Sequence, residues 1–144
     1  MKRIIISLAF ILGVATVVSA DERPINVGHM PRVALEFLRS YYADSLVTSA
    51  NVELGTLDTD YEVKLADGTE IDFDKRGEWT EITNRRAGVT PKVLPLKITD
   101  YVKEHYPDAH YIKIERSSRK YEVKLTNGLE LLFSLDGKML GFDD

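Results

Sequence analysis

The chain has 144 residues and a formal net charge of −4 at pH 7, from 19 Lys and Arg against 23 Asp and Glu, and it contains no cysteine. The absence of cysteine excludes disulfide bonds, thiolate metal sites and cysteine nucleophiles. The acidic balance argues against a nucleic-acid partner, because polyanion binding needs clustered Lys and Arg. The one basic cluster, Arg85-Arg86, is too short for that purpose.

The first 20 residues have the pattern of a secretory signal peptide. Lys2 and Arg3 form a positive start, residues 4–18 are mainly apolar, and small residues end the segment at Ala20. Signal peptidase recognises this arrangement. The apolar stretch is shorter than the ~20 residues that a membrane-spanning helix needs. We therefore expect cleavage after Ala20 and a periplasmic or secreted product without a membrane anchor, in which residues 21–30 lead into the first folded unit.

Residues 31–82 are predicted to form one helix followed by four strands. Pro31 suits the first position of a helix, and the period then changes from 3.6 to two, which is typical of strands. Asp67-Gly68 indicates a tight hairpin, because both central residues of a type I′ turn have positive φ. A second turn at Arg76-Gly77 leads into the last strand. The apolar residues of the helix face are Ala34, Phe37, Leu38, Tyr41 and Tyr42.

Residues 95–144 repeat this pattern after a connector, residues 83–94. Nine of nineteen positions are identical between residues 61–79 and 121–139, including an intact Tyr-Glu-Val-Lys-Leu. The sequence thus predicts an α+β fold of two tandem αββββ repeats, with the helices packed on one face of antiparallel sheet of about eight strands in total. It leaves open whether the repeats share one continuous sheet or form two tandem sheets.

The helix followed by Tyr-Glu-Val-Lys-Leu, then Asp-Gly or Asn-Gly, Glu, Phe and Gly, resembles the PepSY-like, beta-lactamase-inhibitor-like family of bacterial periplasmic proteins. The resemblance extends from about Pro31 to Phe142. It implies a tandem αββββ architecture, residence in the periplasm, no known catalysis, and a concave sheet that grips other proteins. The namesake inhibitor's disulfides have no counterpart in this chain, which argues against beta-lactamase inhibition itself. No functional residue carries over, because the matching positions are structural.

No catalytic or metal-binding pattern emerges from the residues. His105 and His110 do not form the i, i+4 helical pair of zinc sites. Asp72 and Asp74 are similar to the start of a calcium loop, but Thr83 stands where the bidentate Glu belongs. The sequence has no P-loop, dinucleotide fingerprint or nucleophile elbow. We therefore predict a protein that is not an enzyme, with no cofactor and no tightly held metal; weak divalent-cation binding is a minor alternative.

The candidate binding residues are those that face away from the predicted core. Period two places repeated charges on the strand face opposite the helices, and Leu132 stands there in place of an aspartate. Trp79 is the only tryptophan, a residue type enriched in interface hot spots. Cross-strand charge pairing and core packing are the alternative roles. The predicted protein-binding residues are Trp79, Leu132, Glu62, Lys64, Glu122 and Lys124.

The leading functional hypothesis is a periplasmic, non-catalytic protein-binding or inhibitor-like module that uses the helix-free sheet face. Its partner is an unknown envelope protein, no nucleic acid is expected to bind, and the chain is expected to have no membrane anchor after signal cleavage. The alternative is an envelope sensor or carrier that binds a small ligand or a cation. An exposed apolar patch on the sheet would favour the first hypothesis. A closed, partly polar pocket between helix and sheet would favour the second.

Overall fold

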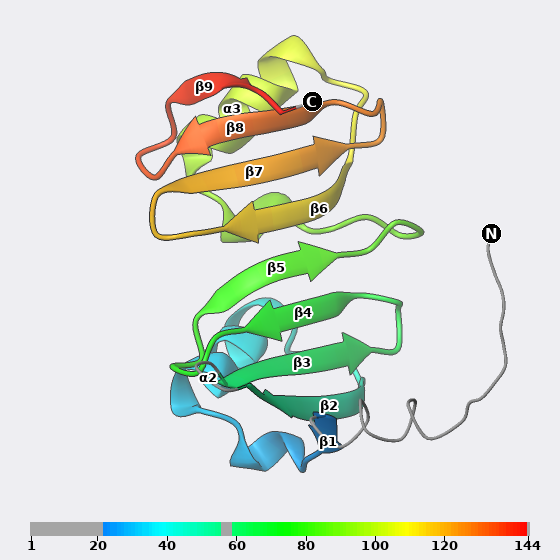
Figure 1. The fold of residues 1–144 in the computed structure, drawn as a ribbon. Helices are drawn as coiled ribbons and strands as arrows, with labels where there is room; N and C mark the ends of the chain where they lie inside the picture. The colour runs from blue at the N-terminus through cyan, green and yellow to red at the C-terminus, as the bar shows by residue number, and fades with distance from the viewer. Residues whose placement is uncertain (1–21, 56–58, 144) are drawn as a thin grey trace, which may run out of the picture.

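The computed structural model describes residues 22–55 and 59–143, and the predicted signal peptide lies outside them. Within the described residues the chain forms one antiparallel sheet of nine strands, each paired with the next along the chain (Figure 1). The elements are β1 Glu22–Pro24, the 3₁₀ helix η2 Val27–His29, α2 Arg32–Tyr41, β2 Val47–Leu54, β3 Thr59–Leu65, β4 Glu70–Phe73, β5 Trp79–Thr83, the 3₁₀ helix η3 Pro91–Val93, α3 Leu96–His105, β6 Tyr111–Arg116, β7 Lys120–Leu125, β8 Glu130–Ser134 and β9 Met139–Phe142.

The predicted α+β class and antiparallel sheet are confirmed, but the strand count is nine and not about eight. The additional strand, β1, comes from the lead-in at residues 21–30 and pairs with β2. The sheet is continuous because β5 pairs directly with β6, with Ile82 opposite Ile114. That pairing answers the question that the sequence left open.

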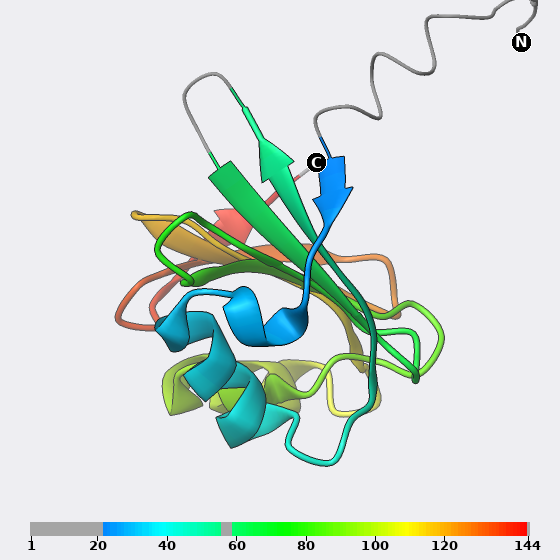
Figure 2. The same ribbon diagram turned by 90° about the horizontal axis from the view of Figure 1, so that it is seen from below.

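Both helices cover the same face of the sheet, as predicted, and leave the other face free of helices (Figure 2). Each helix buries two side chains four residues apart, Ala34 and Leu38 in α2 and Ile98 and Val102 in α3. Side chains at this spacing lie on one side of a helix. No helix within residues 22–55 and 59–143 is long and apolar enough to cross a membrane.

The core lies between the helices and the sheet. Phe73 of β4 and Phe133 of β8 have no exposed surface. Each receives an aromatic side chain edge-on from the helix above it. Phe37 of α2 lies 5.8 Å from Phe73, and Tyr101 of α3 lies 5.6 Å from Phe133, measured between ring centres. The same arrangement therefore anchors each helix to its half of the sheet.

Candidate functional site: an acidic row on the helix-free face

Five carboxylates lie side by side across the middle strands of the sheet. The register places Glu62 opposite Asp72 and Asp72 opposite Glu81. Glu81 in turn lies opposite Glu115, and Glu115 opposite Glu122. We call these five residues the acidic row. Like charges directly opposite each other destabilise a sheet, so the row is not explained by the needs of folding.

The row faces away from the helices, because a strand directs successive side chains to opposite faces. Each of the five carboxylates has a chain neighbour that is fully buried on the helix side. These neighbours are Val63, Ile71, Ile82, Ile114 and Val123, each with no exposed surface.

One lysine partly neutralises the centre of the acidic row. Lys113 places its Nζ 3.3 Å from a carboxylate oxygen of Glu115 and 4.0 Å from one of Glu81. Among the described residues, no salt bridge includes the remaining three members of the row, at its two ends. Within the described residues these three carboxylates therefore lack an ion pair, although the charge of Lys64 lowers the pKa of Glu62.

Burial, and after it the crowding of carboxylates, raises the pKa values of three members of the row. Burial, followed by the charges of Glu62 and Glu81, raises the pKa of Asp72 from 3.8 to about 6. Burial, together with a hydrogen bond to Asp143, raises the pKa of Glu122 from 4.5 to about 7. The pKa of Glu62 is also raised, chiefly by burial. A bound cation beside the row would lower these pKa values, because an opposite charge favours the ionised form.

Next to the Glu62 end of the row the surface is hollowed. A depression of about 350 Å³ opens over strands β1 to β5. Carboxylates dominate its lining: Glu22, Glu53, Asp60, Glu62 and Asp72. The size of the depression and its negative charge suit a cationic group, such as the ammonium of a lysine or the guanidinium of an arginine.

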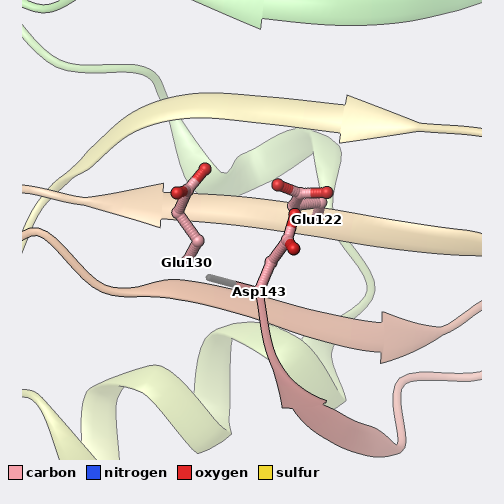
Figure 3. Close-up of side chains that lie close together, drawn as sticks. All are labelled: Glu122, Glu130 and Asp143. Carbon is pink, nitrogen blue, oxygen red and sulfur yellow. The ribbon is translucent and has the colours of Figure 1, made fainter.

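At the other end of the row, three carboxylates converge (Figure 3). They belong to Glu122 on β7, Glu130 on β8 and Asp143 just after β9. One oxygen from each lies within 4.8 Å of the other two. Oxygen ligands of this kind are those that Ca²⁺ binds in proteins.

The structure brings five of the six predicted binding residues together on the helix-free face. Glu62 and Glu122 belong to the acidic row, and Leu132 continues it beyond Glu122. Lys64 and Lys124 lie one row away, opposite Glu70 and Glu130 respectively. Leu132 is half-buried there.

Trp79 does not belong to this surface, and its placement corrects the sequence-based hypothesis. Its side chain is only 4% exposed, because it lies opposite Phe73 on the helix side of the sheet. Its ring lies 6.2 Å from those of Phe37 and Tyr121. The alternative role of a packed residue is the one that the geometry supports.

The binding residues predicted from the sequence do not include two members of the row, Glu81 and Glu115. They face each other across the junction of β5 and β6, whose pairing the sequence left open. The buried residues that follow and precede them, Ile82 and Ile114, show the alternation that could have assigned both glutamates to the outer face.

A larger cavity, of about 740 Å³, lies on the helix side between α3 and the connector. Its lining mixes apolar side chains with polar ones, among them Tyr42, Asp67 and Lys103. The hydroxyl of Tyr42 is buried without a hydrogen-bond partner among the described residues, and burial raises the pKa of Tyr42 to about 12. This cavity is separated from the acidic row by the sheet.

The structural class is that of an α+β protein with an open antiparallel meander. Both helices cover one face of the sheet, and the opposite face is charged. The chain belongs to the family described as "Putative beta-lactamase-inhibitor-like, PepSY-like", whose profile matches residues 59–141. The resemblance stated from the sequence motifs is thereby confirmed. A search of curated proteins gives no match.

Three similar crystal structures come from Bacteroides species. One is a "putative calcium-regulated periplasmic protein" of Bacteroides thetaiotaomicron, 38% identical over 88% of this chain and 99% of that one, with a TM-score of 0.82. Two are from Bacteroides vulgatus, each described as a "putative periplasmic protein". One is 37% identical over 86% of this chain and 98% of its own, and the other 34% identical over 85% and 99%; both have a TM-score of 0.78.

Proposed function

We propose that the protein is a non-catalytic periplasmic binding module whose acidic row binds a positively charged segment of another envelope protein. The observation that supports this proposal is the row itself, five carboxylates in direct cross-strand register. A sheet face that served only as a solvated surface would gain from opposite charges at these positions. Three similar structures are described as periplasmic proteins, which supports the compartment expected from the signal-peptide pattern.

A cationic partner would supply the missing charge. Lysine or arginine side chains placed over the two ends of the row would pair with Glu62 and Asp72, and with Glu122, which form no salt bridge within the described chain. Such complementarity sets the orientation of a partner and rejects acidic competitors. Because the contacts are electrostatic and partly exposed, binding should weaken as ionic strength rises.

Neutralising the row tests the proposal. A variant with Glu62→Gln, Asp72→Asn and Glu122→Gln removes three charges with little change of shape. A control variant with Asp44→Asn, Glu104→Gln and Asp108→Asn removes the same charge at exposed sites elsewhere. Immobilised wild type, row variant and control are each incubated with envelope extract at low and moderate salt, and retained proteins are quantified by mass spectrometry.

We expect the wild type and the control to retain basic proteins at low salt. The row variant should not retain these proteins. Retention of the same proteins by all three would refute the proposal. A loss that is equal in the row variant and the control would mean that total charge, and not the row, governs binding.

A second candidate function is calcium binding at Glu122, Glu130 and Asp143. Two observations favour it: the convergence of the three carboxylates, and the description of one 38% identical relative as "calcium-regulated". Calorimetric titration with CaCl₂ tests it, with MgCl₂ as a comparison. We expect a dissociation constant on the order of 0.1–1 mM, as for extracellular calcium modules, lost in Glu130→Gln and kept in Glu70→Gln. The absence of heat at several millimolar calcium would reject this candidate.

A further inference from the structure

The two edges of the sheet differ in how they are protected. β1 is only three residues long and consists of Glu22, Arg23 and Pro24; short length, charge and proline all discourage pairing with a further strand. β9 is also short, at four residues, but it contains neither a charged residue nor a proline. Its residues Leu140 and Phe142 are 56% and 55% exposed, and within the described residues no strand pairs with its outer edge.

β5 shows what β9 would look like with a neighbour. In β5, Ile82 lies opposite Ile71 and Glu81 opposite Asp72. In β9, Phe142 lies opposite Leu131 and Gly141 opposite Leu132, each pair sixty residues further on. The two strands differ on their other side. Ile82 is covered by β6 and fully buried, whereas Phe142 is 55% exposed and, among the residues that the structure describes, has no strand on its outer side.

The strand that covers β5 carries a definite chemistry. Ile114 of β6 lies opposite Ile82, and Lys113 lies opposite Thr83. The corresponding positions at β9 are Phe142, which would take an apolar residue, and Asp143, which would take a basic one. The carboxylates of Glu122 and Glu130 lie beside Asp143, so this end of the edge is complementary to a cation.

The backbone of β9 is also available for pairing. The N–H of Asp143 donates to the carbonyl oxygen of Glu130 on β8, at 2.9 Å. In an antiparallel ladder, successive residues direct their N–H and C=O groups alternately toward the two neighbouring strands. The N–H and C=O of Phe142 therefore point to the open edge.

We propose that β9 binds an extended segment of another protein as a tenth, antiparallel strand, with an apolar residue opposite Phe142 and a basic residue opposite Asp143. This is strand addition, in which main-chain hydrogen bonds supply affinity and alternate side chains supply specificity. The site lies at the sheet edge and does not depend on a partner binding the acidic row. Its chemistry defines the occupant as a segment with lysine or arginine directly before an apolar β-branched or aromatic residue.

A fluorescent peptide that contains Tyr-Ile-Lys-Ile-Glu-Arg, the sequence of β6, is the probe, and anisotropy with the full-length chain measures binding. Phe142→Pro removes the edge N–H, and Phe142→Ser removes the apolar side chain but keeps the N–H. Leu135→Ser is the matched control, since Leu135 is exposed to a similar degree in the turn before β9. We expect saturable binding that is at least tenfold weaker in both Phe142 variants and unchanged in the control.

Two further measurements keep the test decisive if Phe142→Pro fails to fold. A peptide with Lys113→Glu should bind at least tenfold more weakly to the wild type. Adding the peptide should slow amide hydrogen exchange at Phe142. Exchange at Ile82 should stay unchanged; a change there would mean that the peptide displaces β6 from β5. Equal binding by the wild type and Phe142→Ser, or no binding of the peptide at millimolar concentration, would overturn the proposal. So would a concentration-dependent dimer of the free protein that Phe142→Ser abolishes, because the occupant would then be a second copy.

Discussion

The guanidinium of Arg116 stacks on the ring of Trp79, with its central carbon 4.3 Å from the ring centre. Its Nε and one terminal nitrogen also donate to the carbonyl oxygen of Trp79, at 3.1 and 3.0 Å. Trp79 begins β5 and Arg116 ends β6, so the pair joins these strands beyond their three paired positions. A cation over an indole ring and charged hydrogen bonds to one carbonyl act together here.

Arg116→Ala should therefore lower the free energy of unfolding by about 1–3 kcal/mol. This is the range for loss of a charged hydrogen-bond donor, which here leaves the carbonyl oxygen of Trp79 without its partner. Arg116→Lys should recover only part of the loss, because an ammonium cannot donate in the same planar fork. Trp79 is the only tryptophan, so its fluorescence reports both the local environment and unfolding in urea. Arg119→Ala, at an exposed site, is the control; equal stability of the two alanine variants would contradict the role of the pair.

Gly137→Ala should be more destabilising than Gly128→Ala. Both glycines have positive φ, +94° and +90°, so the backbone strain of adding a side chain is the same. They differ in space: a Cβ at Gly137 would lie 2.6 Å from the Cβ of Lys97 on α3, whereas a Cβ at Gly128 would meet nothing within 4 Å. Thermal unfolding compares the stability of the two variants, and the difference between them measures the effect of the close contact between the turn and the helix. Equal losses would show that only the backbone conformation requires glycine.

The protein should become more stable as the pH is lowered from 8 toward 5. The pKa values of Asp72 and Glu122 are raised in the fold, from 3.8 to about 6 and from 4.5 to about 7. Between the ordinary and the raised values the folded chain binds more protons than the unfolded chain, so the free energy of unfolding falls as pH rises. The loss of unfolding free energy caused by these two carboxylates is absent below about pH 4 and complete above about pH 7.

A matched variant separates this effect from the titration of other groups. The chain with Glu62→Gln, Asp72→Asn and Glu122→Gln should show a flatter pH dependence and a higher melting temperature than the wild type at pH 8. The control with Asp44→Asn, Glu104→Gln and Asp108→Asn should keep the wild-type slope. If the melting temperature of the wild type decreases as the pH is lowered from 8 to 5.5, the row is not the dominant titrating feature.

The sequence predicts the elements of this fold well because their signals are local. The change from helical period to period two, and the turns at Gly68 and Gly128, specify helices, strands and hairpins within a few residues of their observed positions. The buried state of Phe73 and Phe133 follows from the same alternation. The interpretation as a tandem repeat stays a prediction.

What the sequence does not predict depends on contacts between distant segments. Nothing local shows that β5 pairs with β6, so the continuity of the acidic row through Glu81 and Glu115 emerges only from the register. The residue type of Trp79 favours a binding role. The register and the bulge next to it turn its side chain toward Phe37 on the helix side, which residue type alone does not indicate.

Leu132→Arg tests the extension of the acidic row beyond Glu122. Leu132 is half-buried on the helix-free face, whereas its neighbours Leu131 and Phe133 are fully buried on the other. Because its side chain is outside the core, the substitution should change the free energy of unfolding by no more than about 0.5 kcal/mol, as at surface sites generally. The new guanidinium would lie opposite Glu122 and satisfy the carboxylate that a cationic partner would otherwise contact.

The same variant should therefore lose the envelope proteins that the wild type retains at low salt, by both repulsion and competition for Glu122. Leu135→Arg adds the same charge at an exposed leucine in the following turn and should retain them. Urea denaturation and the retention assay together decide the outcome. A stability loss of several kcal/mol would mean that Leu132 belongs to the core, since only burial makes a charge that costly. Unchanged stability with unchanged retention would place the partner surface nearer the Glu62 end, where the five-carboxylate hollow lies.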